Sequence, residues 1–204
     1  ENPIKVFTRL NIGKIPLTNA ELIKALFLNS SNFDKCEANH LKLRQQEMAS
    51  EWDNIEYTLQ NDEFWLFLNE KGYNPQTRID LIFKLICDQN KFGLDEKQLK
   101  EIGDDEYRTF RYFYELFEAK KKNIDECWEC VKNYFRTFLE WYNDLKLYHY
   151  VGFLIACKEG SLETFVKQWE NSPDKDAFES FLKENIRSVI KKCPALSAQY
   201  KEDG

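Results

Sequence analysis

Helix-start signals followed by apolar side chains at helical spacing recur along almost the whole chain. Thr18 and Glu21 form one such signal, a capping box, in which each side chain accepts a hydrogen bond from the other residue's backbone N–H. Apolar residues then recur at intervals of three and four, and only the stretches near Val6 and Val151 are ambiguous with a strand. The 204 residues include 7 Gly and 5 Pro, fewer turn residues than an all-β fold of many short strands needs. The sequence therefore predicts an all-α fold, with about ten helices in an irregular bundle and no substantial sheet.

The predicted helices are bounded by Gly, Pro and polar capping residues. Asn29–Asn32 is predicted to be a polar loop, Asn74-Pro75 to begin a helix, and Gly160 to close one. The predicted helical segments cover residues 3–12, 19–28, 41–59, 64–70, 75–86, 95–101, 107–117, 124–141, 147–155, 162–169 and 178–190.

Two tryptophans are predicted to be structural. Trp52 lies on the apolar stripe that runs from Leu41 to Leu59 along a long amphipathic helix. Trp65 lies in the short helix that follows, which is able to fold back on that stripe. We therefore expect both rings to contribute to stability, as Thr18 and Glu21 do.

Residues 1–204 are predicted to form a single helical domain or fragment. The weakest joints are Asn90–Asp95 and Glu101–Asp105, so any subdivision is expected near residues 90–104. The chain opens with Glu1 and has neither an initiator Met nor an apolar leader, which predicts an excised piece of a larger protein.

The charge and the cysteines limit the partners and the compartment. A net charge of -6 and a pI of about 5.2 disfavour a surface that binds duplex DNA directly. The longest apolar run, Val151–Cys157, is too short to span a bilayer. Apart from Cys127 and Cys130, the six cysteines lie far apart in a chain with enough apolar residues for a core, so reduced thiols are expected. The sequence predicts a cytoplasmic protein without a membrane contact.

Few residue patterns point to chemistry. The glycine-rich phosphate loops are absent from the sequence. Cys127 and Cys130 have the spacing of zinc ligands, and the further ligands would have to be Cys36 with His40, or His149. The simpler interpretation is that Cys127 is a small core residue within a helix. The sequence thus predicts no catalytic residue, no metal site and no cofactor bound by this chain alone.

Two segments resemble one known protein family. Residues 7–26 contain Arg9, Asn11 and Gly13 ahead of a Leu-Thr and a Glu-Leu pair. They resemble the Phe-x-Arg-x-Asn-x-Gly…Leu-Thr…Glu-Leu segment of GmrSD-type restriction endonucleases, whose N-terminal domain has a ParB/sulfiredoxin-like fold. Residues 49–67 are similar to the helical segment that follows in that family, through Ala49-x-x-Trp52-Asp53-x-Ile55-Glu56-x-x-Leu59…Phe64-Trp65-x-Phe67.

The resemblance implies a place within a larger protein. In that family the N-terminal domain binds and hydrolyses nucleoside triphosphate, and a partner domain with an HNH nuclease motif cuts modified or foreign DNA. The family's Asp-Gly-Gln-Gln-Arg motif lies upstream of the matched segment and does not occur in this chain. The resemblance therefore implies a helical, non-catalytic part that supports a missing nucleotide-binding domain. Nucleoside triphosphate and a divalent metal would belong to the parent protein, and DNA would be contacted only through the nuclease domain of the same or a partner chain.

The matched segment also provides three candidate residues for the edge of the nucleotide site. Arg9 can pair with a phosphate through two donors, Asn11 can cap or bond locally, and Gly13 allows the backbone to leave a helix at positive φ. The alternative interpretation is helix termination at Gly13, with Arg9 solvated or paired to an acid. A second functional hypothesis, of another class, is an autonomous all-α interaction module whose grooves hold a partner helix or peptide.

Overall fold

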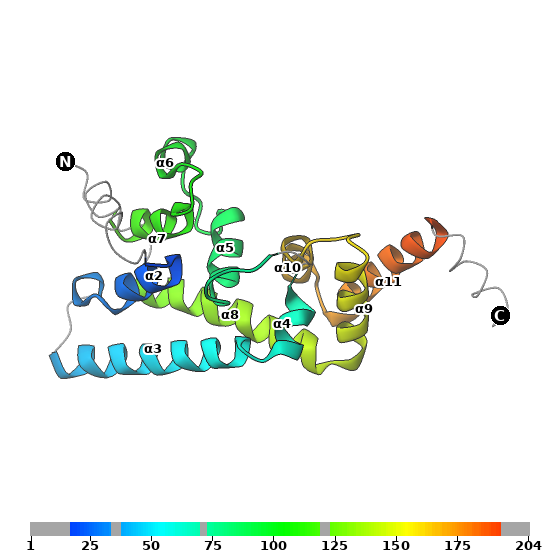
Figure 1. The fold of residues 1–204 in the computed structure, drawn as a ribbon, viewed down its shortest axis with the longest axis horizontal. Coiled ribbons are helices and arrows are strands. Elements are labelled where there is room, and N and C mark those ends of the chain that lie inside the picture. The colour runs from blue at the N-terminus through cyan, green and yellow to red at the C-terminus, as the bar shows by residue number, and fades with distance from the viewer. Residues whose placement is uncertain (1–16, 34–37, 70–72, 119–122, 193–204) are drawn as a thin grey trace. The chain divides into compact units, whose positions relative to one another are not determined.

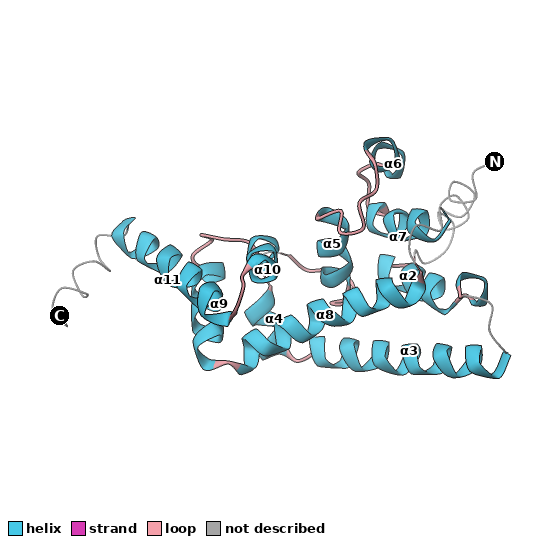
Figure 2. Cartoon of the chain, turned by 180° about the vertical axis from the view of Figure 1, so that it is seen from behind, coloured by secondary structure: helices cyan, strands magenta, loops and turns pink. Residues whose placement is uncertain are grey.

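Helices account for nearly all of the regular structure. The computed structural model describes residues 17–33, 38–69, 73–118 and 123–192. Within these ranges the chain forms ten α-helices, one short 3-10 helix and no strand (Figures 1 and 2). The predicted all-α fold is confirmed. None of the described helices combines the length and the apolar character that a membrane crossing requires.

Two compact units divide the chain. Unit 1 comprises Glu1–Gln60 and Pro75–Asn133, and unit 2 comprises Asn61–Asn74 and Tyr134–Gly204. The joints near residues 90–104, which the sequence marks as weakest, therefore lie inside unit 1. Unit 1 contains α2 (Asn19–Leu28), η1 (Ser30–Asn32), α3 (Ala38–Leu59), α5 (Asp80–Asp88), α6 (Glu96–Ile102), α7 (Arg108–Glu118) and the first part of α8 (Ile124–Asn143). Unit 2 contains α4 (Asp62–Leu68), the rest of α8, α9 (Leu145–Ala156), α10 (Leu162–Asn171) and α11 (Lys175–Lys192).

Unit 1 is built around a cluster of aromatic rings. Trp52 of α3 and Trp128 of α8 stack with their ring centroids 5.6 Å apart and their planes 5° apart. Both α2 and α5 pack against α7. Phe27 of α2 lies at the centre, and its ring centroid is 5.3–6.4 Å from those of Trp52, Phe83, Phe113, Phe117 and Trp128. Offset and edge-on contacts of this kind add to the stabilisation that burial alone provides.

The first turns of two helices in unit 1 are held by reciprocal side-chain caps. At α2, the Glu21 backbone N–H donates to Thr18 Oγ1 at 3.1 Å, and the Thr18 N–H donates to Glu21 Oε2 at 2.8 Å. The helix occupies residues 19–28, as the sequence predicts. At α6, Asp95 and Gln98 form the same arrangement. Each cap satisfies backbone donors that the helix itself leaves without partners.

Two predicted boundaries in unit 1 are wrong. Ser30–Asn32 form a 3-10 turn instead of an irregular loop, because Asn29 accepts a hydrogen bond from the Ser31 N–H at 3.0 Å. The helix predicted to start at Asn74-Pro75 begins only at Asp80. There the Thr77 hydroxyl donates to the Asp80 carboxylate at 2.7 Å, and residues 76–79 form turns.

The end predicted for α9 is also wrong. The helix ends at Ala156, four residues before Gly160. Lys158 adopts the left-handed conformation with φ of 57°. Its N–H donates to the carbonyl of Ile155, and the N–H of Glu159 donates to that of Leu154. These hydrogen bonds are typical of a helix C-terminus at which one residue adopts a positive φ. That residue is usually glycine, and here it is Lys158.

Unit 2 is held by a second aromatic core and by a pair of parallel helices. Trp141 of α8 stacks on Phe178 of α11 at 5.4 Å, and Trp169 of α10 lies edge-on to both rings. α9 and α11 pack together and run parallel to each other. Their ion pairs show this direction, because residues later in the α9 region pair with residues later in α11: Asp144 with Lys175, Lys146 with Glu179, and Glu159 with Lys192.

Candidate functional site

The three candidate nucleotide-binding residues Arg9, Asn11 and Gly13 lie outside the described residues. The four residues predicted to be structural are all described, and the structure distributes them over both units. Thr18 and Glu21 cap α2, and Trp52 is 1% exposed in the core of unit 1. Trp65 is buried in unit 2, where α4 packs against α9.

Carboxyl groups lie near the first turn of α2, where the charges of Glu21 and Glu56 act on Asp80. Asp80 is a partly buried carboxyl, and its Oδ1 has no hydrogen-bond partner among the described residues. Burial raises the pKa of Asp80 more than the hydrogen bonds to the Thr77 hydroxyl and the Ala20 backbone lower it, and the charges of Glu56 and Glu21 add to the rise. A phosphate approaching this position would be repelled. Nucleotide binding near α2 would thus require a compensating cation, such as a metal or an arginine.

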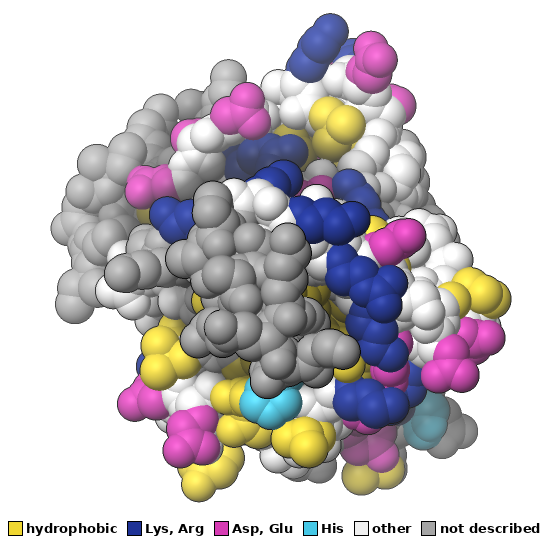
Figure 3. Space-filling view, turned by 90° about the vertical axis from the view of Figure 1, so that its right-hand side faces the viewer, with side chains coloured by type: hydrophobic (Ala, Val, Ile, Leu, Met, Phe, Trp, Pro, Cys, Tyr) yellow, Lys and Arg dark blue, Asp and Glu magenta, His cyan; other side chains and the backbone are white. Residues whose placement is uncertain are grey.

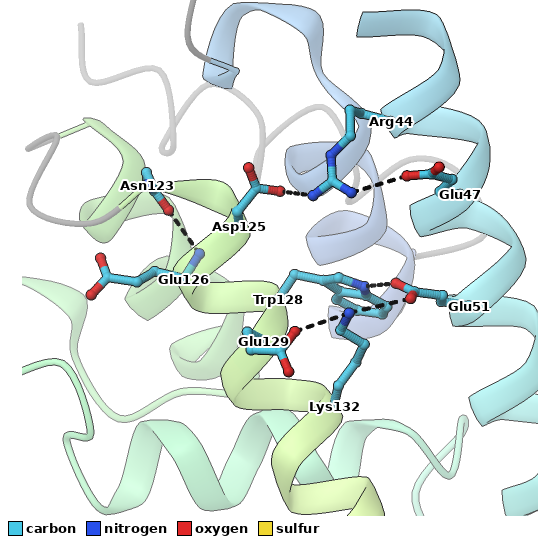
Figure 4. A network of polar contacts seen from close by, with 9 residues as sticks. All are labelled: Arg44, Glu47, Glu51, Asn123, Asp125, Glu126, Trp128, Glu129 and Lys132. Carbon is cyan, nitrogen blue, oxygen red and sulfur yellow. Dashed lines mark hydrogen bonds and ion pairs between the residues drawn. The ribbon is translucent and has the colours of Figure 1, made fainter. Parts of the chain in front are cut away.

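A network of polar contacts joins α3 to α8 within unit 1 (Figure 4). Glu51 lies at its centre: Oε2 accepts from the Trp128 indole N–H at 2.5 Å, and Oε1 lies 3.2 Å from Lys132 Nζ. The Lys132 ammonium also pairs with Glu129 at 3.0 Å. Burial lowers the pKa of Lys132, but hydrogen bonds to Glu129 and Glu51 outweigh it and hold the pKa above its ordinary value.

This network holds the two helices together. Arg44 extends it by bridging Glu47 on its own helix to Asp125 on α8. The carboxylates of Glu51 and Asp125 are thus engaged by donors of the same unit, which leaves them poorly placed to take a proton from a substrate. We assign the network to the alignment of α3 and α8.

The cysteines of the described chain are placed as core or surface thiols. Cys127 is fully buried in α8, and Cys130 is partly buried one turn later. Within the described ranges no three His, Cys, Asp or Glu side chains lie close enough together to hold a metal ion. Burial raises the pKa of Cys87 to about 11, so that this thiol is protonated and unreactive near neutral pH.

The surface feature that stands out lies in unit 2, on α4, α9 and the end of α8. We call it the α4/α9 face and define it by Leu66, Phe67, Tyr142, Leu145 and Tyr148. Leu66 and Leu145 are 72% and 74% exposed, and Tyr148 is 38% exposed. Figure 3 shows one side of the molecule, where hydrophobic side chains lie open to solvent among charged ones.

Aromatic rings form the floor of the α4/α9 face. Tyr148 stacks on Phe67 with a centroid distance of 5.1 Å, and Tyr142 lies edge-on to both, at 5.7 Å from Phe67 and 5.6 Å from Tyr148. Phe67 itself is 6% exposed, so the rings are anchored in the core of unit 2. Exposed leucines on a rigid aromatic base are typical of a surface that another protein covers.

The residue pattern of the sequence does not predict this face. Phe64, Trp65, Phe67 and Leu68 are all buried, so Leu66 is the apolar residue on the one open side of α4. Leu145 likewise precedes the buried stripe of α9 and stays outside it. The sequence offered one signal for this face: Leu66 is an apolar residue on the side of its helix that is otherwise polar.

Comparisons of the chain with protein-family models, with curated proteins and with solved structures find no match.

Proposed function

We propose that this chain is a helical scaffold that binds another protein domain through the α4/α9 face. The observation that carries the proposal is the exposure of Leu66 and Leu145 on α4 and α9, the two packed helices that also carry the contacting rings of Phe67 and Tyr148. Full burial of each leucine by a partner would contribute about 1.5–3 kcal/mol to association. The rings of Phe67, Tyr142 and Tyr148 pack on one another, and side chains that are already ordered lose little conformational entropy when they are covered.

The specific form of the proposal follows the resemblance to GmrSD-type proteins. The domain held by the scaffold would be the ParB-like nucleotide-binding domain of the same cytoplasmic protein. The nuclease domain of that chain or of a partner chain would cut DNA. Arg9, Asn11 and Gly13 would lie at the edge of the nucleotide site, joined directly to the capped start of α2. Nucleoside triphosphate and a divalent metal would bind to the parent protein, and the cation would offset the acidic surroundings of Asp80.

Binding between the two parts tests the scaffold role. The 204-residue chain is mixed with the domain encoded immediately upstream, and the dissociation constant is measured by calorimetry. We expect the double substitution of Leu66→Gln and Leu145→Gln to weaken binding at least tenfold while the helical circular dichroism signal stays unchanged. The matched control is Leu43→Gln, because Leu43 is 57% exposed on α3 of unit 1. Equal affinities for the wild type and the double variant would overturn the proposal.

A nucleotide titration tests the specific form. We expect Arg9→Ala in the intact protein to weaken nucleotide binding while the melting temperature without ligand stays nearly unchanged. An unchanged affinity would remove Arg9 from the site. A large loss of unliganded stability would favour the structural interpretation of Arg9.

The alternative function is an autonomous interaction module. It shares the α4/α9 face but takes a helix or peptide from an unrelated protein. The upstream coding sequence separates the two hypotheses, because an Asp-Gly-Gln-Gln-Arg motif shortly before Glu1 is expected only for the first.

A further inference from the structure

We infer that the exposed side of α3 in unit 1 binds a second copy of the chain, and that the two α3 helices pack antiparallel about Ser50. The inference goes beyond the proposed function, which places another domain on the α4/α9 face of unit 2. The juxtaposition that carries it is an uncharged stripe of exposed residues that is symmetric about Ser50.

The side of α3 that faces solvent carries no charged residue within Ala38–Leu59, all of which the structure describes. The helix runs along one edge of unit 1 (Figures 1 and 2) and buries one side against it. The opposite side is exposed, and we call the residues there the outer stripe: Asn39, Leu43, Gln46, Ser50, Asn54 and Tyr57. Such a side is normally the charged one, whereas the charged residues of α3 lie on its flanks. Depletion of charge is typical of surfaces that another protein covers.

The largest side chains of the outer stripe are widely open to solvent. Leu43 is 57% exposed and Tyr57 is 77% exposed. Leu43, Ser50 and Tyr57 follow one another at intervals of seven residues, which is close to two helical turns. A spacing of seven keeps residues on the seam along which two long helices pack. The exposed residues of α3 are therefore arranged to contact another helix along its length.

The outer stripe is complementary to itself when a second copy runs antiparallel. Leu43 lies seven residues before Ser50, and Tyr57 lies seven residues after it. With Ser50 on a twofold axis, each Leu43 packs against the Tyr57 ring of the second copy, and the small serine allows the two backbones to approach. A twofold interface uses the same surface on both copies. The symmetry of the stripe thus selects a second copy of this chain over an unrelated helix.

The carboxylates beside the stripe do not oppose this packing. Glu47 and Asp53 lie three residues before and after Ser50, which places them on opposite edges of the stripe. In an antiparallel twofold pair, each edge lies beside the same edge of the other helix. Glu47 is then opposite Asn54 of the second copy, and Asp53 is opposite Gln46. Each acid meets an amide group, which can donate to a carboxylate.

Each of these acids also has a cation in its own unit. Glu47 pairs with Arg44 at 3.0 Å, and Asp53 pairs with Lys24 at 2.8 Å. The flanks of the outer stripe therefore bring little net charge to the interface, and two like surfaces can meet without strong repulsion.

The area of the stripe predicts a weak dimer. Its six residues are fewer than the roughly 20–30 that each partner contributes to an interface of standard size. We expect a dissociation constant on the order of 10–100 μM.

Sedimentation velocity measures this association. Over roughly 5–500 μM, the average mass should rise from the 24.4 kDa of one chain toward twice that value. Ser50→Glu brings two carboxylates together on the twofold axis, so we expect it to weaken association at least tenfold while the circular dichroism stays unchanged. The matched control is Ser188→Glu, the same change at an exposed serine of α11, which should associate as the wild type does.

A charge pair tests the antiparallel orientation. We expect Leu43→Glu and Tyr57→Lys each to weaken association about tenfold. Combined in one chain, they should recover most of that loss, because the introduced carboxylate of one copy then meets the introduced ammonium group of the other. In a parallel pair, like charges would meet, and the double variant would be weaker than either single variant.

The outcomes are decisive and independent of the α4/α9 face. A monomer at every concentration overturns the inference, and a dimer that persists unchanged in Ser50→Glu overturns the assignment to α3. A double variant weaker than both single variants overturns the antiparallel arrangement. Leu43→Gln should weaken self-association and leave the affinity for the upstream domain unchanged, so the same variant separates this inference from the scaffold role.

Discussion

The stacked pair of tryptophans in unit 1 allows one substitution to be compared at two nearly equivalent sites. Trp52 and Trp128 are 1% and 2% exposed, and their rings pack against each other and against Phe27. The indole N–H groups differ. That of Trp128 donates to Glu51 Oε2 at 2.5 Å, whereas that of Trp52 is buried and has no partner among the described residues.

The expected difference follows from these two N–H groups. Substitution by Phe leaves a cavity of similar size at each site, which costs roughly 1 kcal/mol. Trp52→Phe also removes a buried donor without a partner, whose presence costs about 1–3 kcal/mol, so the net change should be small or stabilising. Trp128→Phe loses a hydrogen bond to a charged acceptor, which adds about 1.5–3 kcal/mol of destabilisation. We expect Trp128→Phe to be less stable than Trp52→Phe by at least about 2 kcal/mol.

Urea unfolding followed by circular dichroism measures this difference. Both residues belong to unit 1, so the two variants report on the same transition even if unit 2 unfolds separately. The slope with urea should stay constant while the midpoint moves. Trp52→Ala, which empties the whole site, should cost roughly 3–5 kcal/mol and confirms that the probe senses this core. Equal midpoints for the two Phe variants would refute the argument from the indole N–H groups.

Three further predictions concern local features. Thr18→Ala should destabilise the protein by about 1 kcal/mol, because the α2 cap is lost. Thr58→Ala, which removes a hydroxyl bonded to the preceding turn of α3, should leave the stability nearly unchanged. The denaturation midpoints of the two variants measure this difference. Burial raises the pKa of Asp80 in the folded state, so the contribution of this carboxyl to folding stability falls as the pH rises above 3.8, its ordinary pKa. Asp80→Asn should therefore be more stable than wild type at pH 7. In thermal melts this variant should lose less stability than wild type between pH 4 and pH 7. A wild-type pH profile in that variant would refute the assignment. Gly103→Ala should cost about 1–3 kcal/mol because its φ of 67° and ψ of -171° suit glycine alone, whereas Gly152→Ala in α9 should raise stability by about 0.5–1 kcal/mol. Calorimetric melts that move both variants in the same direction would contradict this pair.

Local signals determined much of the secondary structure. The Thr18/Glu21 cap lies between residues three apart, and its hydrogen bonds need no other part of the chain, so the sequence alone located α2. The helices predicted to begin at residues 124 and 162 also begin there, where the Asn123 and Ser161 side chains accept hydrogen bonds from backbone N–H groups in the first turn. Apolar spacing then separated helix from strand, because the two periods differ.

The tertiary structure decided what depends on distant partners. Lys158 ends α9 because the fold holds it at positive φ, although glycine is the residue that takes this conformation at least cost. Trp128 reaches Glu51 across 77 positions of sequence, and α4 joins α9 in unit 2 although it directly follows α3 in the chain. The α4/α9 face arises in the same way. Leu66 and Leu145 are ordinary apolar residues in the sequence, and only the packing of α4 and α9 in unit 2 leaves both of them exposed. The burial of a residue is set by which helices meet and not only by the helix that carries it.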